Sequence, residues 1–369
     1  MGCKALVAHM PEPVPPPPNP LADPPRRRPR YPGKHPRRFD QKYKELDPHR
    51  DPATLAKVLA SGKTPAGSHI PIMVSEILEA LAPKPGELAV DCTFGRGGHA
   101  RAILHRILPG GHLLALDADP IELPRTEALL RAEGFGPESL TVKKSNFAGI
   151  QAALASIGAK GADLILADLG VSSMQLDNPA RGFTTKHSGP LDMRMNPARG
   201  LPASDWLKRT KPEKLAAILA ENSDEAHAAA IAARIAGQRF DETLALANAI
   251  RSALPLQTET ETRTTLARVF QAIRIEVNEE FSALDALLRA LPNCLNPGGR
   301  IAILSFHSGE DRRVKKALQV AHRAGIYSAI ARDPIRPGPA EKQSNPRSTP
   351  AKLRWALTPP SDAPRHRQP

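Results

Sequence analysis

The first segment with residues suited to chemistry is a glycine-rich loop, Asp-Cys-Thr-Phe-Gly-Arg-Gly-Gly-His, at 91–99. It follows the apolar run 88–92 and precedes a stretch with helical spacing of apolar residues, 100–108. Glycines let the backbone turn sharply and approach a ligand closely, as in nucleotide-binding loops between a strand and a helix. A tight strand–helix turn that binds nothing has the same pattern, so the loop alone leaves both interpretations open.

An acidic residue ends the next apolar run. Asp117 closes the run 112–117 and lies 20 residues after Gly97. In doubly wound folds a carboxylate at this place accepts hydrogen bonds from a ribose diol. The ligand is therefore expected to carry an adenosine-like ribose, which fits both a dinucleotide and S-adenosylmethionine. Asp119 competes for this role, and we favour Asp117 because it lies directly at the end of the run.

Two more polar segments follow apolar runs. Asp168 ends the run 163–168, where its carboxylate is placed to accept a hydrogen bond from an amine under attack; capping the next turn is the alternative. Ser-Phe-His-Ser at 305–308 ends another run, and His307 is expected to face the same crevice. As the alternative to a functional role, Ser308 can cap the following helix, whose first-turn acids complement its dipole.

Basic residues gather where the chain leaves these runs. Residues 181–214 carry a net charge of +5, which makes this stretch the best candidate for a nucleic-acid patch, with a solvated surface as the alternative. Aromatic residues make up only 4% of the chain, so extensive base stacking is not expected. The candidate side chains for contacts with nucleic acid are Arg181, Arg194, Lys208, Arg209, Arg312 and Arg313.

The elements that must position these residues alternate between short apolar runs and helices, which indicates βαβ units and a parallel sheet. The predicted strands are 88–92, 112–117, 140–142, 163–168, 300–306 and, after a polar loop, 352–357. No comparable strand occurs between 168 and 300, which predicts a helical subdomain inserted into the sheet. Its predicted helices are 213–220, 225–236, 243–253 and 265–290, the last returning to the sheet. A further amphipathic helix is predicted at 72–81.

Composition and charge bound the class of protein. The chain has 369 residues, 41% of them hydrophobic, which excludes full disorder. Of the net charge of +13, +7 lies in 1–66 and +5 in 331–369, so the body is nearly neutral. Basic ends favour a polyanion such as nucleic acid, or are simply solvated. Three cysteines without CxxC spacing argue against disulfides and zinc and fit a reducing compartment. No apolar run is long enough to span a bilayer, and no secretory signal is visible.

Taken together, these motifs closely resemble the bacterial 16S ribosomal RNA (cytosine-N4)-methyltransferases known as RsmH or MraW. The resemblance covers about 69–357, leaving the tail 1–66 outside. The matching segments, in the family's order, are His-Ile-Pro-Ile at 69–72, 93–99, 116–120, 168–173, Arg-Gly-Phe at 181–183, 189–195, 270–275 and 305–308. Residues 258–269 depart from the family's commoner wording before Phe270.

The resemblance implies an α/β fold: a class I S-adenosylmethionine-dependent methyltransferase, a Rossmann-like sheet with an inserted all-α subdomain. It implies methylation of the exocyclic N4 of a cytosine in the decoding region of 16S ribosomal RNA, within the small ribosomal subunit and in the cytoplasm. It leaves the oligomeric state open, a homodimer included. The cofactor-binding residues it implies are Gly97, Gly98, His99, Asp117, Phe147, Asp168 and Gln175.

The expected organisation follows from these assignments. A disordered tail rich in Pro and Arg, 1–66, has fifteen prolines and is interpreted as an auxiliary RNA-binding segment. The methyltransferase domain is expected in two parts, 67–180 and 276–358. They flank a helical, RNA-binding insertion at 181–275, and a flexible tail occupies 359–369.

Mechanistically, Asp168 is expected to hold the amine so that its lone pair faces the methyl group, and His307 is a candidate proton relay. No cysteine lies in 168–175, which argues against C5 methylation through a cysteine adduct, and no metal site is expected. Two rivals remain open: a nicotinamide-dependent oxidoreductase and a non-catalytic RNA-binding assembly factor. Transfer of label from S-adenosylmethionine, as opposed to binding of NADH, distinguishes a methyltransferase from the oxidoreductase. Loss of methylation in the Asp168→Ala variant distinguishes an enzyme from the assembly factor.

Overall fold

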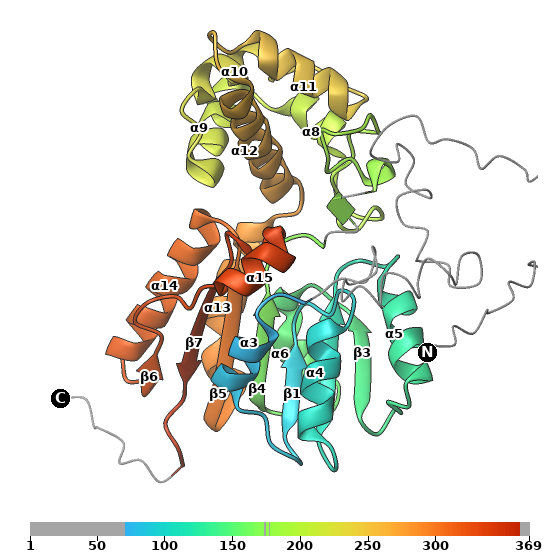
Figure 1. Ribbon diagram of the computed structural model, residues 1–369, viewed down its shortest axis with the longest axis vertical. Helices are drawn as coiled ribbons and strands as arrows, with labels where there is room; N and C mark the ends of the chain where they lie inside the picture. The colour runs from blue at the N-terminus through green and yellow to red at the C-terminus, as the bar shows by residue number, and fades with distance from the viewer. Residues whose placement is uncertain (1–70, 173–174, 177, 362–369) are drawn as a thin grey trace, which may run out of the picture. The chain divides into compact units, whose positions relative to one another are not determined.

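The computed structural model describes residues 71–172, 175–176 and 178–361. The expected tail 1–66, and residues 362–369 of the expected C-terminal tail, lie outside these residues. The described chain forms a seven-stranded sheet in the order β3-β2-β1-β4-β5-β7-β6 (Figure 1). The strands are β1 (Leu88–Asp91), β2 (His112–Asp117), β3 (Leu140–Lys144), β4 (Ala162–Asp168), β5 (Leu295–Ser305), β6 (Ala329–Ile330) and β7 (Lys352–Leu357).

Strands β1 to β5 pair in parallel, whereas β7 runs antiparallel to both β5 and β6. The predicted strands are therefore confirmed. The two-residue edge strand β6 was not predicted, because so short a segment has no periodicity to detect. Strand β5 also begins earlier than expected, at Leu295, and pairs with Ala162 across a register shift.

Helices bury both faces of the sheet. One face packs against α3 (Val74–Leu81), α4 (Gly98–Ile107) and α5 (Leu123–Ala132), and the other against α6 (Ile150–Ala155), α13 (Glu280–Ala290) and α14 (Ser308–Arg323). Along β1, Ala89 belongs to the first core and Val90 to the second. Burial on both faces explains why these strands read as continuous apolar runs.

The strand order places the candidate acids at one edge. Strand β1 has β2 on one side and β4 on the other, because the chain continues from β1 to β2 and β3 on one side and then crosses over to β4 on the other. Asp91, Asp117 and Asp168 are the last residues of these three parallel strands. Their carboxyl ends therefore face the crevice in which ligands of open α/β sheets bind.

A helical segment follows β4 and precedes α13 in the chain (Figure 1). It has its own hydrophobic core. Its helices are α8 (Ala203–Arg209), α9 (Pro212–Ser223), α10 (Ala228–Ile235), α11 (Thr243–Ser252) and α12 (Glu259–Val277). Helix α12 begins with a capping box in which Thr258 and Glu261 exchange hydrogen bonds, within the stretch whose wording departs from the family. Together with the sheet, these helices confirm the expected fold class.

The prediction of one helix over 265–290 is wrong, because the chain breaks between α12 and α13. Glu279 adopts a left-handed conformation with φ of 52°. The side chain of Asn278 donates to the carbonyl of Met193 and accepts from the N–H of Met195. These contacts with a distant loop fix the break, and they are invisible in the local apolar pattern.

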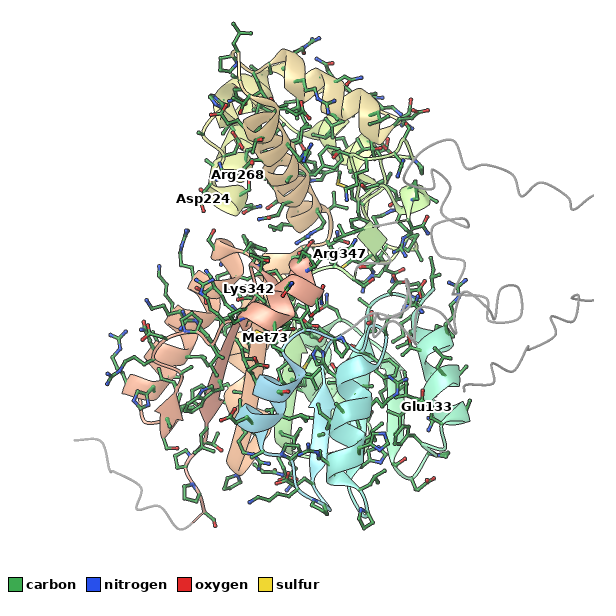
Figure 2. The ribbon with its side chains drawn as sticks, viewed as in Figure 1. Met73, Glu133, Asp224, Arg268, Lys342 and Arg347 are labelled. Atoms are coloured by element: carbon green, nitrogen blue, oxygen red, sulfur yellow. The ribbon has the colours of Figure 1, made fainter. Side chains whose placement is uncertain are left out.

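None of the helices in the described part of the chain is both long and apolar enough to cross a membrane. A short helix, α15 (Pro339–Ser344), and a 3₁₀ turn, η5 (Pro346–Ser348), lead into β7. Figure 2 labels Met73, which precedes α3, and Lys342, which lies on α15. The two segments touch, since the N–H of Met73 donates to Oε1 of Glu341 at 2.7 Å.

Candidate functional site

The glycines of the loop after β1 serve two purposes. Gly97 has φ of 70°, and a Cβ on it would lie 2.8 Å from Leu130. A Cβ on Gly98 would lie 2.8 Å from Pro71. These two positions are thus required by close packing within the protein. Gly95 also has positive φ, but nothing lies nearer to its Cβ position than the Thr93 carbonyl at 3.7 Å, so one side of the loop is open.

Asp117 is tied to this loop. Its Oδ2 accepts from the N–H of Gly95 at 2.7 Å, and its Oδ1 accepts from the N–H of Asp119 at 2.8 Å. Burial raises its pKa, although these backbone donors oppose the shift. The carboxylate is only partly buried, so it is fixed in direction and retains accessible lone pairs.

The competitor, Asp119, is used inside the protein. It is 2% exposed, and its Oδ2 accepts from Nε2 of Gln175 at 2.7 Å and from Nη1 of Arg181 at 3.0 Å. Its Oδ1 accepts from the N–H of Ile121. This arrangement favours Asp117 over Asp119 as the ribose ligand, in keeping with its position at the strand end.

Gln175 and Arg181, expected to contact cofactor and RNA, both meet Asp119. The Gln175 Oε1 also accepts from the N–H of Ser172, so both ends of its amide have protein partners. Arg181 is buried and donates to two backbone carbonyls, those of Arg194 and Met195, besides Asp119. The structure thus holds Arg181 in the interior, where it connects the loop after β2 to the segment before α8.

Asp168 is the last residue of β4, the middle strand of the seven. Its N–H donates to Oγ1 of Thr93 at 2.7 Å, and its Oδ2 lies 3.5 Å from Nδ1 of His99. Its Oδ1 is buried and has no hydrogen-bond partner among the described residues. Burial, with a contribution from the charge of Glu310, raises the pKa of Asp168 to about 7. This carboxylate therefore has a free acceptor atom and keeps its proton to a much higher pH than an ordinary aspartate.

His99 is buried beside Asp168. Its Nε2 lies 2.9 Å from the carbonyl oxygen of Ile72. Burial lowers its pKa, whereas the Ile72 carbonyl and the charges of Asp91 and Glu341 act in the opposite direction. At neutral pH the imidazole is accordingly uncharged.

Asp91 is a site residue for which sequence reasoning assigned no role. It is 1% exposed, and its Oδ1 accepts from the N–H of Thr93 while its Oδ2 has no partner within the described chain. Burial raises the pKa of Asp91 to about 6. The hydrogen bond from the Thr93 N–H and the charge of His99 oppose this rise, whereas the charges of Asp168 and Asp117 add to it. Its position as the first residue of the glycine loop was the only available signal.

His307 lies in a separate acidic environment. Its Nε2 is 3.2 Å from Oε1 of Glu310, but neither ring nitrogen forms a hydrogen bond with good geometry in the described structure. Burial would raise the pKa of Glu310, but His307, the N–H of Phe306 and the charge of Arg274 together hold it below its usual value. The structure gives no direct contact between His307 and Asp168, and Glu310 interacts with both.

The alternative interpretation, in which Ser308 caps the following helix, is wrong. Helix α14 begins at Ser308 itself, with His307 at the N-cap position and no side-chain cap. The Ser308 hydroxyl instead donates to Oδ2 of Asp224, at the end of α9, which Figure 2 labels. Glu310 accepts the N–H of Phe306 and thereby satisfies a backbone donor just before the helix.

Phe147 follows β3 in the short turn η2 (Phe147–Gly149). Its ring is half-buried against the core of the second sheet face. The N–H of Ser145 donates to the carbonyl of Asp117, so the chain just before Phe147 is fixed to the strand that bears the candidate ribose acid. Phe147 is thus two residues along the chain from a backbone contact with Asp117.

The remaining candidate RNA-binding residues differ in whether they already form ion pairs or hydrogen bonds within the protein. Arg194 makes a two-pronged contact with Asp192, and Arg313 donates to Asp285 and lies over the ring of Phe281. Arg312 is half-exposed and 3.6 Å from Asp224. Two exposed side chains at the end of α8 have no ion pair or hydrogen bond in the described chain: Lys208 and Arg209.

The assembled edge suits a cationic, ribose-bearing ligand. It offers a fixed carboxylate at Asp117 and two buried carboxylate oxygens without partners, on Asp91 and Asp168. Such oxygens are costly to leave unpaired, and a positive charge nearby would compensate them. In the part of the chain that is described, no three or more His, Cys, Asp or Glu side chains are grouped so that they could hold a metal ion.

Comparison with known proteins places the chain. It is 47% identical over 341 residues to "Ribosomal RNA small subunit methyltransferase H 1" of Lachnoclostridium phytofermentans, covering 90% of this chain and 93% of that protein. It is 46% identical to the protein of the same name from Agathobacter rectalis, covering 90% and 97%. Among solved structures, a putative rRNA-methylase from Clostridium thermocellum aligns with 12% identity and a TM-score of 0.39, covering 79% of this chain and 99% of that one.

The sequence model of one family, described as the MraW methylase family, matches residues 66–358. The coverage of 90% by the two relatives exceeds what these residues alone supply, so the likeness reaches into the flanking segments. The expectation that the whole of 1–66 and 359–369 lies outside the resemblance is thereby corrected. On the extent of both matches, the chain belongs to the MraW methylase family.

Proposed function

We propose that this methylase transfers a methyl group to the exocyclic N4 of a cytosine in the decoding region of 16S ribosomal RNA. The family supports methyl transfer, and the names of the relatives support a substrate in the RNA of the small ribosomal subunit. The observation that carries the chemistry is Asp168. It is a largely buried carboxylate at a strand end, with a free, fully buried Oδ1 and a pKa of about 7.

S-adenosylmethionine is the cofactor, and when bound it supplies an electrophilic methyl group on a positively charged sulfur. The residues present fit such a group, because the unpartnered oxygens of Asp91 and Asp168 call for a cation and Asp117 for a diol. The residues proposed to hold it are Gly97, Gly98, His99, Asp117, Phe147, Asp168 and Gln175. For Gln175, this role requires that its amide serve Asp119 and the ligand together.

The catalytic task of Asp168 follows from the weakness of the nucleophile. The cytosine amine is conjugated with its ring, so its lone pair is poorly available. By accepting an N–H hydrogen bond at Oδ1, Asp168 would orient the amine and favour the conformation in which the lone pair points outward. Positioning of this kind can lower the free-energy barrier of the reaction by several kcal/mol. His307 is retained as a candidate proton relay, with Glu310 as its nearest carboxylate.

RNA contacts are proposed for the helical insertion at 181–275 and for the start of α14. Lys208 and Arg209 are the best candidates, since both are exposed and unengaged in the described chain. Arg312 and Arg313 would have to exchange exposed acidic partners for phosphate, which costs little at a surface. Arg194 is held by Asp192 and contacts RNA only if that pair opens.

A ribosomal RNA substrate places the proposed activity in the cytoplasm. A homodimer is a further prediction, which light scattering on the purified chain tests.

The decisive test of function is mass-spectrometric mapping of small-subunit ribosomal RNA from source cells lacking the gene. We expect N4-methylcytidine to disappear from one decoding-region position and to return with the wild-type gene but not with Asp168→Ala. Arg125→Ala, on the exposed face of α5, serves as the matched control and should restore it.

Three outcomes would contradict the proposal. Unchanged N4-methylcytidine in the deletion strain would remove the substrate assignment. Full complementation by Asp168→Ala would favour an RNA-binding assembly factor instead of an enzyme. Binding of NADH, without transfer of label from S-adenosylmethionine, would favour an oxidoreductase.

A further inference from the structure

A continuous line of polar contacts leads from α15 to Asp168. The Ile72–Met73 peptide lies in the middle of it. Its N–H donates to Oε1 of Glu341 at 2.7 Å, and its carbonyl oxygen lies 2.9 Å from Nε2 of His99. The other ring nitrogen, Nδ1, lies 3.5 Å from Oδ2 of Asp168. One peptide unit therefore connects a carboxylate far along the sequence to the imidazole beside the candidate catalytic acid.

The carbonyl of Ile72 fixes which nitrogen of His99 carries hydrogen. A carbonyl oxygen only accepts, so the 2.9 Å contact requires a proton on Nε2. In the uncharged ring Nδ1 then has a lone pair, and this lone pair is on the side of Asp168. A second proton on this pair of side chains can be shared by the two residues only between Nδ1 and Oδ2.

We propose that His99 and Asp168 hold one proton in common, and that Glu341 sets the proton affinity of this pair through the Ile72–Met73 peptide. His99 and Glu341 are then positioning residues that act through Asp168. This inference rests on the proposed function for its catalytic meaning. As a statement about protonation it stands on the geometry of the protein alone.

The proton balance of the reaction gives this pair a task. As the N4–carbon bond forms and the carbon–sulfur bond breaks, with its electron pair remaining on sulfur, the nitrogen is left with one proton too many. That proton passes from N4 to the carboxylate of Asp168, where it comes to lie between Oδ2 and Nδ1 of His99. The pair, which begins as carboxylate and neutral imidazole, ends with one shared proton, and it returns to its first state by losing this proton to solvent.

The surroundings bring the two proton affinities together. Burial raises the pKa of Asp168 to about 7, with Glu310 contributing, and burial lowers the pKa of His99 below its ordinary value of 6.5, so the wide gap that separates a free carboxyl group from a free imidazole is removed. Asp91 faces His99 from β1 and opposes that lowering, as does Glu341. Asp117 acts on Asp91 from β2. Groups with similar proton affinity titrate as a pair, so neither carries the proton exclusively.

The first test uses the free protein. Nitrogen-15 spectra of the full chain should show neutral His99 with its proton on Nε2. His322 is an internal reference, because its Nδ1 lies 2.8 Å from the Tyr327 carbonyl and should carry the proton instead. In Asp168→Asn, the midpoint of the His99 titration should fall by roughly one pH unit or more. In Glu341→Gln, which keeps an acceptor for Met73, it should fall by less.

A His99 signal with its proton on Nδ1, or a His99 titration that is the same in wild type and Asp168→Asn, would overturn the inference. An unchanged titration in Glu341→Gln would remove the part assigned to Glu341. All of these readings need no substrate, so they stand or fall separately from the proposed function.

The second test uses methyl transfer in a single turnover at saturating cofactor. The wild-type rate should rise with pH around 7, as Asp168 ionises. In His99→Gln the midpoint should move to lower pH, since the shared proton loses one of its two sites, while His105→Gln, on the exposed face of α4, should leave it in place. If His99 only contacts the cofactor, His99→Gln would raise the KM for S-adenosylmethionine and leave the midpoint unmoved. Absence of transfer by the wild type would refute the proposed function and not the shared proton.

Discussion

Arg181 and Asp119 form a buried ion pair, with 3.0 Å between Nη1 and Oδ2. Asp119 lies two residues after the candidate ribose acid, and its own N–H donates to Asp117. Arg181 lies in the loop that leads to the helical insertion and also holds the carbonyls of Arg194 and Met195. The ion pair therefore joins the proposed cofactor side of the molecule to the segment proposed to meet RNA.

Replacing Arg181 should be strongly destabilising. Arg181→Ala leaves the Asp119 carboxylate buried without its cation, which typically costs about 3–5 kcal/mol. Urea denaturation followed by circular dichroism measures this free energy. Arg125→Ala removes an exposed partner of Glu122 and should cost less than about 1 kcal/mol. Equal decreases in the free energy of unfolding of the two variants would show that the buried Arg181–Asp119 pair contributes no more to stability than an exposed ion pair.

Asp168→Asn should make the protein more stable at high pH. The pKa of Asp168 is raised from 3.8 to about 7, so the folded state keeps a proton that the unfolded state releases. Stability from this group is present below pH 4 and is lost as pH rises toward 7. Above pH 7 the variant should therefore exceed wild type by roughly 2–4 kcal/mol.

Thermal denaturation between pH 4 and 8 provides the measurement for Asp168→Asn. The gain should vanish near pH 4, and a smaller slope should remain because Asp91, with a pKa of about 6, titrates in the same window. A variant that is less stable than wild type at pH 8 would contradict the assignment. The same variant should lose methyl transfer, which would make Asp168 a residue kept for chemistry at the expense of stability.

Replacing Lys208 and Arg209 together by alanine should weaken RNA binding without changing the fold. If each side chain contacts one phosphate, the slope of log affinity against log salt should fall by roughly 1.4 for single-stranded RNA. Lys84 and Lys160 are exposed near the other ends of β1 and β4, so their double alanine variant is the matched control. An unchanged slope in the first variant would place the RNA elsewhere.

Asp117→Asn should weaken binding of S-adenosylhomocysteine by about 10- to 100-fold, the range for hydrogen bonds to a charged group. Isothermal titration calorimetry on the full chain measures this directly. Glu127→Gln, a change at a half-exposed position on α5 that pairs with Arg131, should bind like wild type. If Asp117→Asn also binds like wild type, the ribose is held by another residue.

The parallel sheet and the edge of the site could be predicted because both depend on local pattern. Apolar runs ending in Asp117 and Asp168 place these acids at one edge as soon as the strands are taken as parallel. The glycine loop was found for the same reason. Its packing against Pro71 and Leu130 was not, because nothing in a run of glycines identifies the neighbour that excludes a Cβ.

Contacts between distant segments account for what sequence reasoning missed. Glu341 reaches Met73 across 268 positions, and Asn278 reaches Met193 across 85, and no spacing rule connects such pairs. Arg181 illustrates the limit for charged residues. Its type and loop position suggested RNA, and only the burial of Asp119 beside it shows the partner that it has.

The separate core of the helical insertion has a consequence for how the protein folds. Strands β4 and β5 are hydrogen-bonded neighbours, yet the whole helical segment and α13 lie between them in the chain. Closing so long a loop is entropically costly and slows non-local pairing. Since α8 to α12 enclose Leu207, Leu246 and Ile273 among themselves, they can collapse before the sheet closes and shorten the search. The substitution Leu246→Ala, which leaves a cavity in the core of the insertion, should therefore slow the pairing of β4 with β5. That pairing completes the sheet that carries the candidate site.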